Sequence, residues 1–241
     1  MCYWIVGNGN PVRLYLNGYD QNWYRKSTVN TQGFIVNSTK PATIRMMNYG
    51  GNQTFDTANF LTGYASFDVC ATNASNGKYT TTVKNTHCTT AGGLLCGAGT
   101  FVVGDSAAAS ATTSFSNLTS LVTYNAGTMK IYNTDMNPEN GVTNLSVLGT
   151  STMTLGDGVS FETVQANLSS AASLSIPAGS YVKVSHRTYR DGVALRPGVY
   201  GKVGGTYEDG SAIPAAFQLS CLKGDGWLDT NGPLGFMLIV E

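Results

Sequence analysis

The chain has 241 residues, of which 14 are Lys or Arg and 14 are Asp or Glu, so its net charge is zero, while Ser, Thr and Asn together occupy 69 positions. This length suffices for one large or two small folded cores, and the balanced charge provides no general attraction to nucleic acid or to an anionic membrane. Because 42% of the residues are hydrophobic, the chain is too apolar for a disordered protein.

Short apolar and β-branched runs, separated by Gly, Asn and Asp, recur from one end of the chain to the other. This pattern predicts an all-β fold, an antiparallel sandwich of the jelly-roll type, with two small β domains as the alternative. A helix over 161–173 fits the spacing about as well as a strand, a turn and a second strand, and 217–221 alternates like a strand. The clearest predicted strands are 12–16, 33–36, 43–47, 66–70, 79–84, 100–103, 121–124, 129–132 and 181–189.

Residues 104–113 contain no large side chain. They predict a linker or a long surface loop between an N-terminal β module (1–103) and a C-terminal β module (114–241). The N-terminal module contains four of the five cysteines, Cys2, Cys70, Cys88 and Cys96, and Cys221 lies in the other. We expect reduced, buried thiols; disulfides joining Cys88 to Cys96 and Cys2 to Cys221 are the alternative.

An aromatic and polar segment lies at 17–25. Its planar rings alternate with side chains that donate and accept hydrogen bonds, which suits a sugar or a partner protein. Anchoring of Trp23 or Tyr24 in the core is the alternative, and Trp227, between Asp225 and Asp229, forms a smaller version of the same pattern. The candidate contact residues are Tyr19, Asp20, Asn22, Trp23, Tyr24 and Arg25.

The span from Asn85 to Met129 contains a single charged residue, Asp105. Charged side chains are depleted at the centre of protein interfaces because desolvating them is costly. The span is therefore a candidate contact between subunits, although an intramolecular core strand explains its apolar residues equally well. The candidate interface residues are Leu94, Leu95, Phe101, Val102 and Val103.

Residues that could carry catalysis or bind a metal are scarce. His87 and His186 are the only histidines, and His87 and Cys88 would face opposite sides of a strand, so we expect neither a zinc site nor another cofactor. The fragments 5–7, 86–88 and 220–226 are similar to motifs of chymotrypsin-like serine proteases, but Gly226 stands where that family has its nucleophilic serine. The sequence therefore predicts a protein that is not an enzyme.

These observations favour a structural protein of a virion, such as a phage head-decoration, fibre or tail component, that forms a homo-oligomer and contacts other structural subunits. Residues 1–6 are too short for a signal peptide and lack its basic start, and no apolar run is long enough to span a membrane. The basic run 183–196 is interrupted by Asp191, so no nucleic-acid partner is expected. The alternatives are a bacterial surface adhesin or pilus subunit that binds cell-surface glycans, and a secreted polysaccharide-active enzyme.

Overall fold

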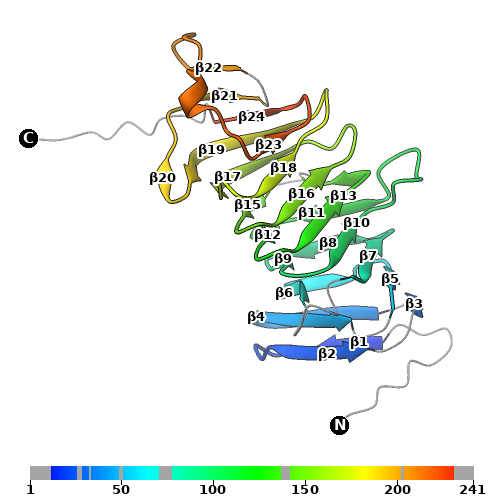
Figure 1. Cartoon of the computed structure of the whole chain (residues 1–241). Helices are drawn as coiled ribbons and strands as arrows, with labels where there is room; N and C mark the ends of the chain where they lie inside the picture. Colours follow the sequence, from blue (N-terminus) through cyan, green and yellow to red (C-terminus); the bar gives the residue numbers. More distant parts are fainter. Residues whose placement is uncertain are drawn as a thin grey trace, which may run out of the picture.

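The computed structural model describes residues 12–25, 29–32, 34–48, 51–70, 78–136, 142–201 and 204–230, and it forms a parallel β-solenoid of about six turns (Figure 1). The all-β prediction is confirmed, but the predicted antiparallel sandwich of the jelly-roll type is wrong. Each successive coil lies beside the previous one with its strands pointing the same way. Alternating inward and outward residues occur in parallel and antiparallel sheets alike, so the pattern alone did not reveal the direction of pairing.

Each full coil passes through three faces of the solenoid, which we call face 1, face 2 and face 3. The long strands β4 and β6 turn a corner and belong to faces 1 and 2 in succession; their mutual register shifts at that corner, between Ser38 and Ala42. Face 1 consists of β1 (Val12–Tyr15), the first parts of β4 (Phe34–Asn48) and β6 (Leu61–Cys70), β8 (His87–Thr90), β11 (Thr113–Ser116) and β14 (Thr134–Asp135).

Face 2 is the widest of the three, and face 3 is a separate sheet of parallel strands. Face 2 consists of β2 (Gln21–Arg25), the second parts of β4 and β6, β9 (Gly93–Cys96), β12 (Ser120–Thr123), β15 (Val142–Val147), β17 (Phe161–Leu168), β19 (Tyr181–Arg190) and β24 (Trp227–Asp229). Face 3 consists of β3 (Val29–Gln32), β5 (Gln53–Asp56), β7 (Thr80–Lys84), β10 (Thr100–Val103), β13 (Thr128–Ile131), β16 (Thr152–Leu155), β18 (Ser173–Ser175) and β23 (Leu222–Lys223).

The C-terminal part departs from this regular pattern. A 3-10 helix (Ala215–Phe217) and three short strands, β20 (Val193–Ala194), β21 (Gly198–Tyr200) and β22 (Gly205–Tyr207), are inserted between β19 and β23, and the strand pairs that they form are antiparallel. The predicted strand over 217–221 is wrong, because Phe217 ends this helix and is exposed while Leu219 and Cys221 are buried. For 161–173, strand, turn and strand is the correct alternative, as β17 and β18 show.

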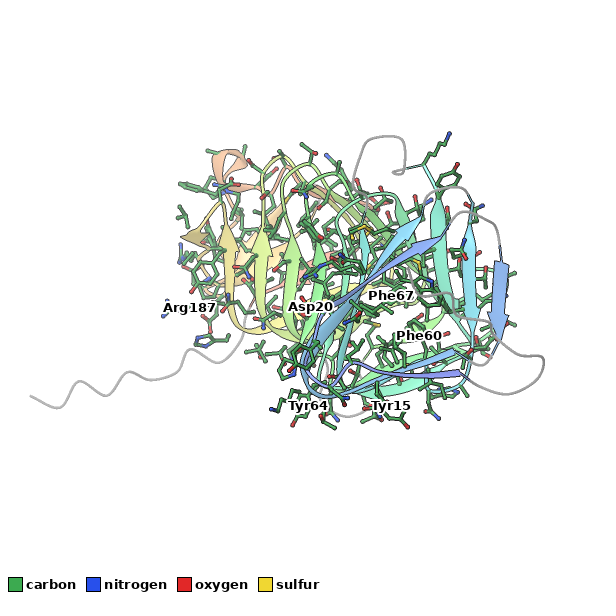
Figure 2. All side chains as sticks on the ribbon, turned by 90° about the horizontal axis from the view of Figure 1, so that it is seen from below. Tyr15, Asp20, Phe60, Tyr64, Phe67 and Arg187 are labelled. Atoms are coloured by element: carbon green, nitrogen blue, oxygen red, sulfur yellow. The ribbon has the colours of Figure 1, made fainter. Side chains whose placement is uncertain are left out.

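The interior is one continuous stack of apolar side chains. On face 2, Ile44, Phe67, Leu94, Leu121 and Leu145 occupy the same position in successive coils, and all are fully buried. Phe67 also contacts three other rings, with centroid distances of 5.6 Å to Phe55, 5.0 Å to Phe60 and 5.5 Å to Phe101. Figure 2 shows Phe60 and Phe67 inside the ring of strands and Tyr15 and Tyr64 outside it.

The corners and outer faces explain the abundance of Asn, Ser and Thr. Asparagine tolerates a positive φ better than most residues with a side chain, and six of the asparagines that the structure describes adopt such a φ at bends of the solenoid, among them Asn85 (53°), Asn117 (61°) and Asn125 (54°). The outward positions of face 3 carry mainly hydroxyl groups, because small β-branched residues fit a flat sheet that faces water. These outward residues include Thr54, Thr80, Thr82, Thr100, Thr128, Thr152, Thr154, Ser173 and Ser175.

Residues 104–113 connect β10 on face 3 to β11 on face 1. Strands on either side of this segment are direct neighbours in all three faces: β10 pairs with β13, β8 with β11, and β9 with β12. The division into modules 1–103 and 114–241 stays a prediction.

Candidate functional site

The N-terminal aromatic and polar segment is partly tied into the solenoid. The Oδ1 atom of Asp20 accepts a hydrogen bond from the backbone N–H of Thr43 (2.8 Å), and the Trp23 ring packs edge-on against buried Phe55, 6.0 Å away. Tyr19 is 73% exposed and Asn22 is exposed as well. Tyr24 and Arg25 belong to β2, but their side chains lie outside the described part of the structure. The structure therefore brings only part of the predicted contact set to the surface.

A charged network connects this segment to face 2. Arg45 donates a hydrogen bond to Asp20 Oδ2 (2.9 Å), its Nε lies 4.0 Å from Asp68 Oδ2, and the Tyr124 hydroxyl donates to the same Asp68 oxygen (2.9 Å). Tyr124 comes from two coils further along and reaches Asp68 by lying over Gly97, where any side chain would collide with its ring. Sequence reasoning did not identify this network, because its members are up to 104 positions apart (Asp20 to Tyr124).

Asp68 is the most perturbed acid of this network. Burial raises the pKa of its carboxyl group, while the hydrogen bond from Tyr124 and the charge of Arg45 act in the opposite direction. Its Oδ1 atom is buried and has no hydrogen-bond partner among the described residues. A carboxyl group of this kind holds its proton to a higher pH than an exposed one, but Asp20, the other acid of the network, is engaged by Arg45 and Thr43. The arrangement links neighbouring coils through Arg45 and, through Tyr124, coils that are two apart.

The predicted subunit-interface residues divide between the two sides of the sheets. Leu94, Phe101 and Val103 point inward and are fully buried in the core. Leu95 on face 2 and Val102 on face 3 point outward and are partly exposed. In this single chain only the last two side chains are therefore accessible to a partner.

An open groove of about 400 Å³ lies on the outside of face 3. At its edge, Lys84 Nζ donates a hydrogen bond to Asp105 Oδ2 (2.9 Å), and Asp105 Oδ1 accepts the backbone N–H of Ala107 (2.9 Å). These contacts lower the pKa of Asp105, chiefly through the N–H of Ala107, and the hydrogen bond to Asp105 raises the pKa of Lys84. The two charges thus hold the start of segment 104–113 against the sheet. The groove is lined by Thr54, Asp56, Thr82, Lys84, Val102, Gly104, Asp105 and Ser106.

The described cysteines are all free thiols, so the alternative disulfide between Cys88 and Cys96 does not form; Cys2, and with it the alternative pair with Cys221, lies outside the described residues. Burial raises the pKa of Cys70 to about 11 and that of Cys96 to about 12, which keeps both protonated and weakly nucleophilic. His87 and Cys88 do lie on opposite sides of β8. Within the described ranges, no three His, Cys, Asp or Glu side chains are grouped closely enough to hold a metal ion.

Two exposed aromatic residues occupy adjacent positions on neighbouring strands at the C-terminal end of face 2. Tyr181 on β19 and Trp227 on β24 are register partners on adjacent strands, and they are 46% and 45% exposed. The sequence singled out Trp227 through its acidic neighbours but missed Tyr181, which is 46 positions away. The alternation of Tyr181 with buried Val182 and Val184 was the signal that could have placed it on the outer face.

No protein-family model, curated protein or solved structure matches this chain. In the described residues there is also no helix of the length and hydropathy needed to cross a membrane.

Proposed function

We propose that the protein is a non-enzymatic structural subunit of a virion, of the fibre or tail type, which associates with copies of itself through an uncharged area of face 2. A solenoid suits an elongated particle component, because its length grows by adding coils while the cross-section of the core stays the same. The observation that carries the proposal is the composition of this area of face 2.

We call this area the uncharged wall. It is formed by the outward side chains of β9, β12, β15 and the second half of β17. On these strands Leu95, Val122, Ser146 and Asn167 are aligned in one row across the coils, and none of the outward residues is charged. The parallel row contains Ser120, Asn144 and Gln165.

The wall has the composition of the centre of an interface. Hydroxyl and amide groups both donate and accept hydrogen bonds, so the surface is able to pair with a second copy of itself, and Leu95 with Val122 provides an apolar strip. Exposed or half-exposed arginines lie beyond the wall on both sides, Arg45 on one and Arg187 on the other. A polar and charged rim around an uncharged centre is typical of subunit contacts. Of the predicted interface set, only Leu95 belongs to this wall; Val102 is partly exposed but lies on face 3, and the other three residues are buried.

The test is the oligomeric state of the purified chain and of two matched variants. Val122→Glu places a charge in the middle of the wall, whereas Thr154→Glu places the same charge on the outside of face 3 in a side chain of similar shape. Light scattering coupled to gel filtration should show an oligomer for the wild type and for Thr154→Glu, and a monomer for Val122→Glu. A wild type that stays monomeric at high concentration, or a Val122→Glu oligomer of unchanged stability, contradicts the proposal.

The assignment to a virion is tested separately by the genes beside the coding region. Neighbouring genes for head, tail or packaging proteins are expected. A neighbourhood of secretion and surface-anchoring genes would instead favour the alternative, a bacterial surface adhesin.

A further inference from the structure

Tyr181 and Trp227 form an exposed aromatic surface at the C-terminal end of face 2. The next residue along each strand, Val182 after Tyr181 and Leu228 after Trp227, is completely buried. These buried side chains anchor the two strands, while the aromatic rings stay on the outside. Adjacent strands are about 4.8 Å apart, so the two side chains arise side by side. Both rings are partly open to water, so they provide a local apolar area on this outer face.

The position of the indole is determined by a glycine. A Cβ atom at Gly201 would lie 2.7 Å from Cζ3 and 3.0 Å from Cε3 of Trp227, so the six-membered part of the indole rests on the bare backbone at this point. Gly201 follows β21, the strand that pairs with β24 on the side away from β19. The indole therefore lies over the backbone that follows β21, on the side away from Tyr181, and nearly half of the side chain remains accessible.

Charged hydrogen-bonding groups lie on the same outer side, two residues further along the strands. Lys183 Nζ donates a hydrogen bond to Glu162 Oε1 (3.3 Å), and these side chains are 44% and 51% exposed. Asp229 is the register partner of Lys183 and also belongs to this row. The surface therefore combines two aromatic rings with carboxylate and ammonium groups within one small area.

We propose that this aromatic platform, formed by Tyr181 and Trp227 with Lys183 and Glu162 beside them, binds pyranose units of a polysaccharide. One face of a pyranose ring presents C–H groups that pack on the electron-rich face of an aromatic ring, and the hydroxyl groups at its rim pair with charged donors and acceptors. A contact with another protein is less favourable, because burying the exposed ion pair at its centre would be costly. The surface is open rather than enclosed, which suits internal units of a long chain and weak binding at each copy.

The binding site does not depend on the proposed self-association, but self-association would strengthen it. An oligomer presents several platforms at once, and linked weak sites give a much higher overall affinity than one site. Binding by isolated monomers and by oligomers can therefore be compared with the Val122→Glu variant, which separates a failure of the glycan site from a failure of the proposed assembly.

The experiment uses an array of defined oligosaccharides and bacterial polysaccharides, probed with the full chain. The wild type should bind at least one carbohydrate of the array, Trp227→Ala and Tyr181→Ala should each lower binding at least tenfold, and Trp227→Phe should retain part of it. Tyr64→Ala is the matched control, because it removes a Tyr of equal exposure (48%) on β6 and should leave binding unchanged.

Circular dichroism and thermal unfolding of each variant establish that it is folded. Absence of binding to every carbohydrate on the array overturns the proposal, as does binding that both Ala variants leave intact. The proposal is also overturned if Trp227→Ala changes the oligomeric state while carbohydrate binding is unaffected, because the platform would then be a protein contact.

Discussion

Replacing Phe67 by Ala should destabilise the solenoid strongly. The Phe67 side chain is fully buried, and its ring contacts the rings of Phe55, Phe60 and Phe101 at centroid distances between 5.0 and 5.6 Å. Removing a buried phenyl group typically costs about 3–5 kcal/mol, depending on how far the site collapses. Because the surrounding rings are held by three successive coils with fixed strand spacing, collapse is restricted, and we expect a cost of about 4–5 kcal/mol.

Two further variants show whether the loss of stability comes from the lost buried volume or from a substitution anywhere in β6. Phe67→Leu keeps most of the volume and should cost only about 1.5 kcal/mol. Tyr64→Ala, three positions away on the same strand but 48% exposed, should lie within about 0.5 kcal/mol of the wild type. Equilibrium unfolding in guanidinium chloride measures the free energy of unfolding of each protein.

Hydrogen exchange should locate the effect. Since coils of a solenoid contact mainly their neighbours, amide protection should decrease first in β5, β6 and β10 and least in β17 and β19. If Phe67→Ala costs less than about 1 kcal/mol, or if protection is lost uniformly along the chain, the described packing of the ring cluster is refuted.

Three other predictions concern the carboxyl group, the corners and the thiols. Burial raises the folded-state pKa of Asp68, so the stability contributed by the protonated carboxyl group is fully present below the unfolded pKa and is lost as the pH rises through the folded pKa. Asp68→Asn should therefore gain stability relative to the wild type as the pH rises above about 4, and unfolding midpoints that stay parallel would refute this. Gly104→Ala should cost at least about 2 kcal/mol more than Gly158→Ala. Both glycines have a positive φ (84° and 75°), but only at Gly104 would a Cβ atom collide with a backbone carbonyl, that of Tyr132; equal melting temperatures of the two variants would contradict this. Burial raises the pKa of Cys70 to about 11, so in a Cys2→Ser background this thiol should react with iodoacetamide at pH 8 roughly a hundredfold more slowly in the folded protein than in the unfolded chain. Mass spectrometry measures the labelling, and rapid modification of Cys70 or Cys96 in the folded protein would show that these thiols are accessible and ionised.

The repeat that defines the fold was hidden in the sequence by unequal coil lengths. Thr80, Thr100, Thr128, Thr152 and Ser173 occupy one position in successive coils, so the coils are 20, 28, 24 and 21 residues long. A solenoid accepts such variation because extra residues bulge out at corners, where they leave the stacking of the strands unchanged. A search for a constant period fails under these conditions, although every coil contains the same inward and outward alternation.

The sequence also did not reveal which residues form the candidate binding surfaces. The charge-poor span from Asn85 to Met129 was visible in the sequence, but alternation alone did not tell which of its residues point outward, and Leu94 and Leu95 proved to lie on opposite sides of β9. Tyr181 and Trp227 are neighbours only because β19 pairs with β24, although the inserted strands β20 to β22 separate these two strands in the sequence.

The sequence by itself determined that this chain is a β protein rich in hydroxyl and amide side chains, because composition and period-two alternation are local properties of each segment. The tertiary structure decided that the strands run in parallel, which side chains share an outer row, and where rings meet charges. These features depend on which coil lies beside which, and the stacking of interior residues such as Ile44, Phe67 and Leu94 is selected by packing across coils rather than by any local preference. Both binding surfaces proposed for this protein are products of that stacking.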